Sequence, residues 1–537
     1  MKYGVCKVVP PPGWMPPSAV HGDIRFDIMN QYISRLFSRW GPAARELSAI
    51  KLCLSQYTNI NFTRPPQLDG VEINLPKLYH LVQRLGGLET VINKNRWSKV
   101  ADDLKITKAG NYEKRLDNIY MKFLLAYDTL SHQERQEIMR KVEVSWNKKN
   151  QKLLDRAMHP LYRQQRMLGL LDSSDEETED ENIKTALKQA EDCIIKGHIM
   201  QHSRFKKVAT MAYENTFGPG SEAASPPSLD HIEEMYWRLV TSGTEHVCVH
   251  TAAIDTGLEG HGFTTTEEPY ASHPWNPKVP IINNPRNILR YLGPVVGVTV
   301  PTLLLGMLFS TSCWHKDPHG VAWYEYQSKG PTRIWYGIPA DQADNFRKAV
   351  ETLSPTSCQN KALWLSSEIA MIPPSALREH NVRLTRVTQN EGEFIMAFPN
   401  AYTSCISTGY TESESVYLAS SHWLDYMWNV ARDSCEPTMF SMEQLLYNIG
   451  RDKDADPDLV RRALPMYDLV LREEVTNRQM LQERGIPFLV FELSLIIRGF
   501  NYIDDVLIHS CRCKMYRLVS GGILVFQGGP FLVLVKI

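Results

Sequence analysis

The chain has 537 residues, of which 43% are hydrophobic, and a formal net charge of −1. This length predicts two to four domains with real cores, and the charge excludes a globally basic nucleic-acid-binding protein, so any basic surface must be local. The ten cysteines include no Cys-x-x-Cys pair, which argues against a secreted disulfide scaffold, and no apolar stretch predicts a membrane span.

The first residues, 2–9, form a short strand-like run that prolines close. A strand alone cannot fold, so we expect it to pair with a sheet elsewhere. Residues 23–131 then predict an all-helical domain, because apolar residues recur at helical spacing. The four segments with this spacing are 24–40, 46–57, 75–85 and 115–125.

Residues 132–228 predict a charged, partly disordered linker. Residues 172–181 carry seven carboxylates in ten positions, and such a block repels itself. After the helical region and before Cys313, the only cysteines are Cys193 and Cys248. Two cysteines are too few for a zinc finger that needs eight ligands.

From residue 229 to about 425 the sequence pattern changes: apolar residues alternate with others, and glycines and prolines interrupt them. This pattern is typical of a β-rich domain. His315 and Asp317 form a His-x-Asp pair, and Thr403 stands where a second histidine would complete a two-histidine, one-carboxylate iron site. Nearby His319 is a weak substitute ligand. A core histidine satisfied by neighbouring carbonyl groups remains an equal alternative for His315.

The helical region resembles an ARID domain over residues 23–131. The motifs that carry the resemblance occur in order along the chain: Pro66-x-Leu68-x-Gly70, Leu75-x-x-Leu78-Tyr79, Gly86-Gly87, Trp97-x-x-Val100 and Tyr120-x-x-Phe123. The resemblance implies binding to duplex DNA, although local charge alone would favour an ordinary solvated face. The expected groove or phosphate contacts are Lys94, Arg96, Lys105, Lys108, Asn111, Lys114 and Arg115.

Residues 229–425 resemble a JmjC domain, a double-stranded β-helix of the cupin type, and residues 1–17 resemble part of a JmjN segment. The predicted fold class is therefore multidomain α+β: an all-α ARID domain and a JmjC β-helix, followed by helices in residues 426–485. The remaining residues, 486–537, form an atypical apolar tail that we expect to be aberrant sequence. Its His509, Cys511 and Cys513 are too few ligands for the family's zinc finger.

The JmjC resemblance also implies that the catalytic site has degenerated. Iron would be held at His315, Asp317 and Thr403, and a threonine hydroxyl is a poor Fe(II) ligand. The positions that would hold 2-oxoglutarate carry unsuitable residues, since a tryptophan fills space and a glutamate repels a dianion. These positions are Trp323, Glu325, Arg333 and Ser407. We therefore expect no enzyme activity, no metal and no cofactor.

The combination of these segments resembles catalytically inactive members of the ARID/JmjC family. It implies a nuclear chromatin regulator that represses transcription as an accessory or recruitment subunit of Polycomb repressive complex 2, with histone H3 and duplex DNA as partners and no membrane. Two alternatives stay open. One is a divergent Fe(II)/2-oxoglutarate histone lysine demethylase, and the other is a DNA-binding scaffold outside Polycomb.

Overall fold

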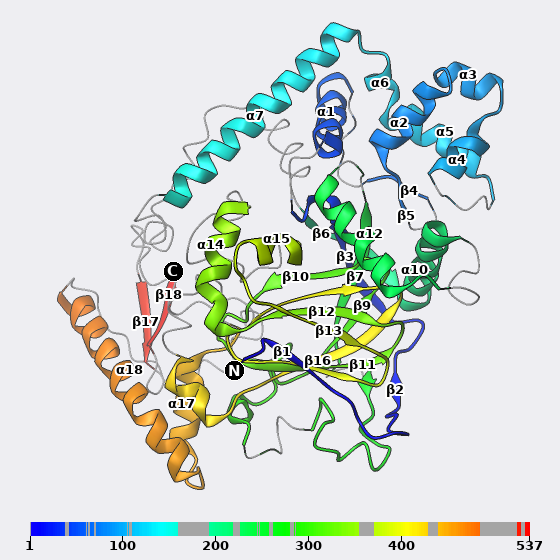
Figure 1. Cartoon of the computed structure of the whole chain (residues 1–537). Helices are drawn as coiled ribbons and strands as arrows, with labels where there is room; N and C mark the ends of the chain where they lie inside the picture. The colour runs from blue at the N-terminus through cyan, green and yellow to red at the C-terminus, as the bar shows by residue number, and fades with distance from the viewer. Residues whose placement is uncertain are drawn as a thin grey trace.

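The computed structural model contains a helical domain and a larger β-rich domain (Figure 1). None of the helices in the described residues is long and apolar enough to cross a membrane. The structure describes residues 2–37, 42–158, 193–218, 226–256, 261–353, 370–427, 439–483, 523–527 and 532–536, apart from short gaps at 59, 61, 63–64, 69–70, 105, 107–109, 244, 246, 280–283 and 285.

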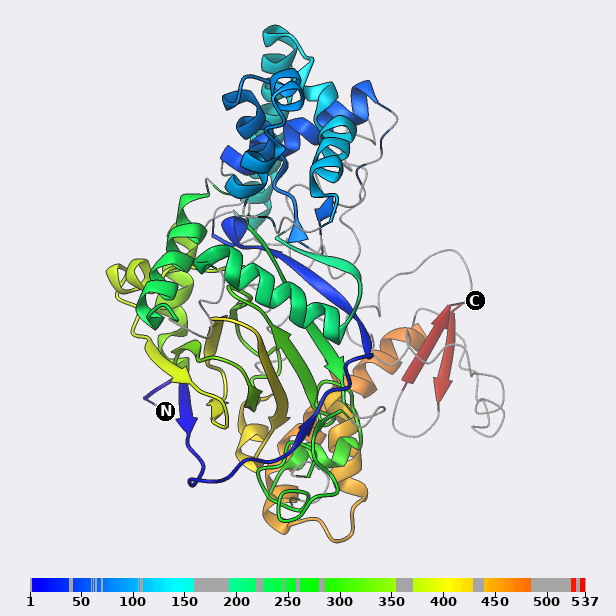
Figure 2. The same ribbon diagram turned by 90° about the vertical axis from the view of Figure 1, so that its right-hand side faces the viewer.

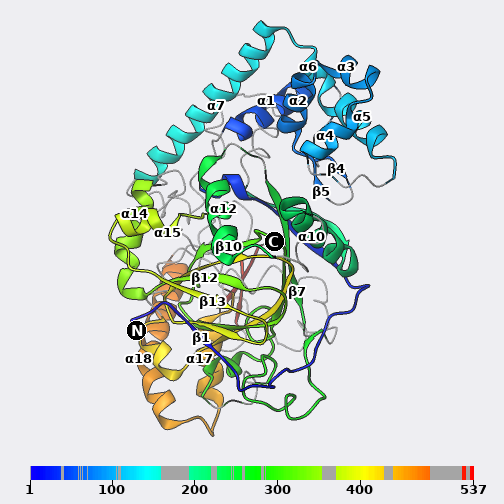
Figure 3. The ribbon, with the colours of Figure 1, turned by 45° about the vertical axis from the view of Figure 1, so that its right-hand side comes forward.

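Seven helices and a short ribbon form the helical domain, seen at the top of Figures 1 and 3. Asn74 caps α2 by accepting a hydrogen bond from the Lys77 amide at 3.0 Å, and Gly86 and Gly87 end it in left-handed conformations. The elements are α1 (Pro42–Tyr57), β4 (Gln67–Leu68), β5 (Val71–Glu72), α2 (Leu75–Arg84), α3 (Leu88–Asn93), α4 (Trp97–Asp103), α5 (Tyr112–Phe123), α6 (Leu125–Asp128) and α7 (His132–Met158).

Helix α7 belongs to this domain, although the sequence placed it in the linker. Ile138, Val142 and Trp146 are buried in the same apolar cluster as the residues of α1, α2 and α5. Arg135, on its first turn, lies over the rings of Tyr79 and Tyr127. Because α7 buries a stripe of this kind, residues 132–146 are part of the packed domain rather than a spacer.

The β-rich domain contains two facing sheets (Figure 2). The larger has the order β1-β14-β11-β16-β9-β7-β3-β6, and the smaller has the order β10-β15-β12-β13. The strands are β1 (Val5–Val8), β3 (Arg25–Tyr32), β6 (Ile194–Gln201), β7 (Cys248–Asp255), β9 (Thr302–Gly306), β10 (Thr311–His315), β11 (Ala322–Lys329), β12 (Arg333–Ile338), β13 (Thr385–Gln389), β14 (Phe394–Ala397), β15 (Tyr402–Ser407) and β16 (Thr411–Leu418).

The remaining elements lie outside these two sheets. The multidomain α+β class predicted from the sequence is confirmed. The elements are β2 (Ser18–Ala19), β8 (Gly262–Phe263), η1 (Ile33–Arg35), η3 (Ile288–Leu292), η4 (Ala340–Gln342), η6 (Ser421–Asp425), α10 (His202–Phe217), α12 (Leu229–Ser242), α14 (Ala343–Leu353), α15 (Pro374–Glu379), α17 (Met442–Arg451), α18 (Pro457–Glu483), β17 (Ile523–Gln527) and β18 (Leu532–Lys536).

The helical domain is inserted between two adjacent strands of the large sheet. Strand β3 pairs antiparallel with β6, with Arg25 opposite Gln201 and Gln31 opposite Ile194. The predicted helix over residues 24–40 is therefore wrong over β3, whose alternating burial has the period of a strand. Strand β6 and helix α10 likewise give regular structure to residues 194–217 of the predicted linker.

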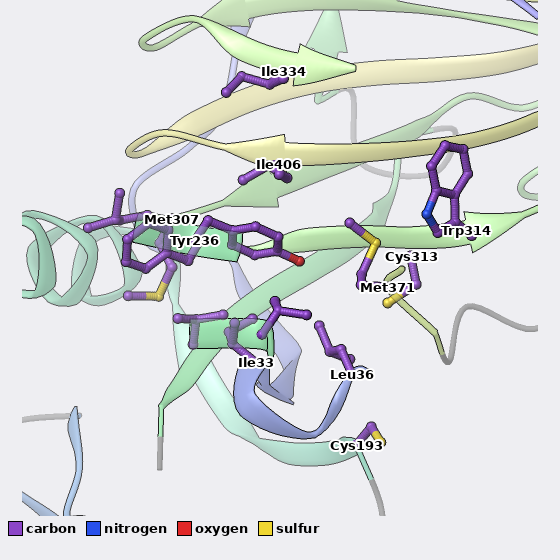
Figure 4. Close-up of a cluster of buried hydrophobic side chains, with 14 of the residues drawn as sticks. Ile33, Leu36, Cys193, Tyr236, Met307, Cys313, Trp314, Ile334, Met371 and Ile406 are labelled. Atoms are coloured by element: carbon purple, nitrogen blue, oxygen red, sulfur yellow. The ribbon is translucent and has the colours of Figure 1, made fainter. Parts of the chain in front are cut away.

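The main core of the β-rich domain lies between the small sheet, helices α12 and α14, and the large sheet. Figure 4 shows part of this core around Tyr236, Trp314 and Ile406. Tyr236 of α12 is fully buried there, and its hydroxyl accepts a hydrogen bond from Thr311 at 2.9 Å. At the sheet's other edge, β1 pairs with β14 and buries Val5. The expectation that the first strand joins a distant sheet is confirmed.

Candidate functional site

The two strands that would carry the iron-binding histidines lie side by side. β10 and β15 pair antiparallel, and His315 stands directly opposite Thr403. The His315 Nδ1 atom lies 2.9 Å from the Cys313 carbonyl oxygen, which orients the ring, while Thr403 is 1% exposed. The predicted juxtaposition of His315 and Thr403 is thus present, with a hydroxyl where a second imidazole would stand.

Asp317 follows β10 and is almost fully buried. Its Oδ1 atom accepts hydrogen bonds from the amides of His319 and Val321, at 2.9 and 3.0 Å. Burial raises the pKa of Asp317 to about 6, and these hydrogen bonds only partly offset it. This carboxyl group therefore stabilises the turn that follows β10.

His319 does not complete the ligand set. Its ring stacks on Phe440, with 4.0 Å between ring centroids, and its Nε2 atom lies 3.3 Å from the Phe440 carbonyl oxygen. Burial lowers its pKa to about 4, so the imidazole is neutral at physiological pH. Through these contacts with Phe440, His319 connects the turn after β10 to the segment before α17.

Iron does not fit the donor set at this position. His315 and Asp317 are ligand types for Fe(II), but Thr403 supplies a neutral hydroxyl. In the described residues, no group of three histidine, cysteine, aspartate or glutamate side chains is placed to hold a metal ion. Three ligands of these types are what the facial triad requires.

A buried ion pair occupies the predicted co-substrate positions. The Arg333 guanidinium, on β12, donates to the Glu325 carboxylate, on β11, and to the Ser413 hydroxyl at 3.0 Å. The side chains of Arg333 and Glu325 are 8% and 3% exposed. Burial alone would lower the pKa of Arg333, but Cys405 and Glu325 together outweigh it and raise the pKa. The cation that would bind a dianion thus already has an anionic partner.

Trp323 lies in an apolar cluster beside this pair. Its ring centroid is 5.5 Å from that of Trp335, and Val5 of the first strand packs in the same cluster. Ser407, the last predicted co-substrate position, is buried opposite Arg333 on β15. The four predicted positions therefore lie on facing and adjacent strands of the two sheets, and Arg333, Glu325 and Trp323 are engaged with neighbouring protein groups.

Two further residues in this region, Ser413 and Gln389, carried no signal in the sequence. Ser413 binds Arg333, and the Gln389 side chain accepts from Trp335 at 2.8 Å while donating to the Glu325 carbonyl at 3.2 Å. These residues come from strands far apart in the chain. Only the register of the two sheets brings them together.

The predicted DNA contacts lie around the ends of α3 and α5. Lys94, Asn111, Lys114 and Arg115 are exposed there. Arg96, by contrast, is half-buried, and its guanidinium donates to the Leu85 carbonyl at 3.2 Å, which satisfies the end of α2. Two remaining predicted contacts lie outside the described residues, Lys105 and Lys108.

The helical domain is tied to the β-rich domain through its short ribbon. The Tyr32 hydroxyl, at the end of β3, donates to the Glu72 carboxylate of β5 at 3.1 Å. Tyr32 is 3% exposed and carries the Arg35 guanidinium 4.2 Å from its ring centroid. This partly buried contact links the β4–β5 ribbon of the helical domain to β3, the strand that neighbours β6.

The helical insertion and the β-helix define a protein that combines an ARID domain with a JmjC domain. The family model described as an ARID/BRIGHT DNA binding domain matches residues 46–128, and the model described as a JmjC domain, hydroxylase, matches residues 302–418.

Most of the chain is similar to Protein Jumonji. It is 31% identical to Protein Jumonji of Gallus gallus over 532 residues, which cover 90% of this chain and 42% of that protein. Lysine-specific demethylase JMJ703 of Oryza sativa subsp. japonica is 30% identical over 46% of this chain and 21% of its own length. Lysine-specific demethylase JMJ17 of Arabidopsis thaliana is 29% identical over 52% and 24%. The chain thus spans less than half the length of these relatives.

Proposed function

We propose that this protein is a nuclear chromatin regulator that binds duplex DNA through its ARID domain and uses its JmjC domain without catalysis. The observation that carries the non-catalytic assignment is the buried Arg333–Glu325 ion pair. The pair stands where the family places the co-substrate, and Thr403 faces His315 where the family places iron.

Energetics favour this proposal over a dormant enzyme. Binding of 2-oxoglutarate at Arg333 would require the guanidinium to leave Glu325, and breaking a buried pair costs about 3–5 kcal/mol. The released carboxylate would then repel the incoming dianion in a poorly screened environment. Trp323 would also have to move out of its packed cluster.

For the partner, we propose Polycomb repressive complex 2, in which the chain would act as an accessory or recruitment subunit that influences methylation of histone H3 at lysine 27 and so represses transcription. The homology with Protein Jumonji over 90% of the chain supports this assignment. Co-purification of the full chain with the methyltransferase subunits from nuclear extract tests it. A chain that binds DNA but never co-purifies with them would instead be a DNA-binding scaffold outside Polycomb.

Salt-dependent DNA binding tests the ARID assignment. The double variant Lys114→Ala with Arg115→Ala removes two exposed cations at the start of α5. We expect weaker binding to a short duplex and a slope of log affinity against log salt that is smaller by about 2, because each phosphate contact contributes about 0.9. The matched control is Lys348→Ala with Arg378→Ala, which removes the same charge from exposed positions on α14 and α15. Equal behaviour of the two variants would contradict the assignment.

The competing function is a histone lysine demethylase, which the names of the two plant relatives and the retained His315 and Asp317 favour. Demethylation of a trimethylated H3 peptide distinguishes the two proposals. We expect no 2-oxoglutarate-dependent loss of methyl groups. Turnover that His315→Ala abolishes would establish the enzyme instead.

A further inference from the structure

A second basic surface lies on the β-rich domain, outside the ARID domain. It comprises Arg204, Lys206 and Lys207 of α10 together with Arg25 of β3, and we name it the α10 basic face. All four residues are exposed. They are neighbours because Arg25 pairs with Gln201, the residue before α10, and because the His202 amide donates to the Ile24 carbonyl at 3.0 Å.

The stability of the fold does not explain the positive charges of this face. Arg204, Lys206 and Lys207 lie in the first two turns of a 16-residue helix, where the helix dipole disfavours positive charge, and the first turn contains no acidic residue. Within the described part of the chain, Arg204 and Lys207 form no ion pair, while Lys206 lies 5.5 Å from the Tyr410 ring centroid.

Acidic neighbours are few on this surface. Asp23 is exposed nearby, and Asp27 is already paired with Lys196 at 2.8 Å. The remaining charge is therefore positive and directed to solvent. Such a surface complements a polyanion. Because the ARID domain is proposed to bind duplex DNA, the phosphate groups of DNA are the polyanion that fits this surface best.

Helix α10 lies on the side of the β-rich domain that is nearest to α4 and α5 of the ARID domain. Figures 1 and 3 show α10 below α4 and α5, beside the ribbon formed by β4 and β5. The partly buried hydrogen bond between Tyr32 and Glu72 ties that ribbon to β3, and β3 pairs with β6, which leads directly into α10. Helix α10 is thus connected to the ribbon of the ARID domain through paired strands and this hydrogen bond.

We propose that the α10 basic face is a second, sequence-independent contact for duplex DNA, which leaves the ARID domain and passes over α10. The inference rests on the proposed DNA binding by the ARID domain and extends the footprint onto the JmjC side of the chain. Its residues contact phosphates and read no bases, since Arg204 and Lys207, which share one face of α10, and the flanking Lys206 and Arg25 supply charge without base-edge contacts.

Duplexes of two lengths test this footprint with the full chain. A duplex of about 12 base pairs is close to one helical turn and serves the ARID domain alone, whereas one of about 30 base pairs extends onto α10. For Arg204→Ala with Lys207→Ala, we expect affinity for the long duplex to fall on the order of tenfold and the salt slope to shrink by about 2. Affinity for the short duplex should stay within about twofold of the parent.

The control and the other outcomes separate this inference from the ARID proposal. Lys348→Ala with Arg378→Ala removes the same charge from α14 and α15, across the molecule in Figure 1, and should bind both duplexes as the parent does. Unchanged long-duplex binding by the α10 variant, or an equal loss in the control, overturns the inference while leaving the ARID proposal intact. If Lys114→Ala with Arg115→Ala leaves short-duplex binding unchanged, the ARID proposal itself fails.

Discussion

Removing Arg333 should destabilise the JmjC domain far more than removing an ordinary surface cation. The side chains of Arg333 and Glu325 are 8% and 3% exposed, so Arg333→Met leaves a buried carboxylate without its cationic partner. Breaking a buried pair in this way costs about 3–5 kcal/mol. For a domain of this size, that loss corresponds to a fall of roughly 10 °C in the unfolding temperature.

A second variant makes the test independent of packing. Glu325→Leu with Arg333→Met replaces both charges by apolar groups, and we expect most of the lost stability to return because no uncompensated charge remains. The assay is denaturant or thermal unfolding of the parent, both single variants and the double variant. If Arg333→Met alone cost less than about 1 kcal/mol, or if the single losses simply added, the positions would be open to solvent and the reasoning would be refuted.

Three further outcomes follow from buried residues elsewhere. Thr403→His alone should give no 2-oxoglutarate turnover, measured as succinate release, because Trp323 and the ion pair still occupy the co-substrate positions. Burial raises the pKa of Glu414 to about 7, so the folded state holds its proton after the unfolded chain has lost it. The contribution of Glu414 to the free energy of unfolding is therefore complete below about pH 4.5, and roughly 3 kcal/mol of it is lost as pH rises through 7. Glu414→Gln should flatten the pH dependence of the unfolding free energy between about pH 5 and 8. Trp146→Ala should lower the stability of the helical domain by about 3–5 kcal/mol and weaken DNA binding. An unchanged stability would show that α7 is a linker helix and not part of the packed domain.

Periodicity in the sequence was sufficient for most of the helical domain. Residues 75–85 and 115–125 predict helices that the structure has as α2 and α5. The same reasoning failed for residues 24–40, where the apolar spacing suits both a helix and a strand. Long-range pairing with β6 and β7 decides for the strand, and no local pattern contains that information.

The candidate site shows the same division between local motif and distant pairing. The His-x-Asp motif and the position of Thr403 predicted a cross-strand neighbour for His315, and the structure has it. The ion pair between Glu325 and Arg333 was not predicted, although each residue was singled out by itself. Glu325 lies in the large sheet and Arg333 in the small one, so their contact depends on how the two sheets face each other.

Anaerobic calorimetric titration of the full chain with Fe(II), with and without 2-oxoglutarate, tests most directly the proposal that the JmjC site is non-catalytic. Because Thr403 supplies only a hydroxyl, we expect no saturable one-to-one iron binding at micromolar concentration. Because Arg333 is already paired with Glu325, we expect 2-oxoglutarate to have no effect on the titration. Stoichiometric iron binding that 2-oxoglutarate tightens and His315→Ala removes would contradict it.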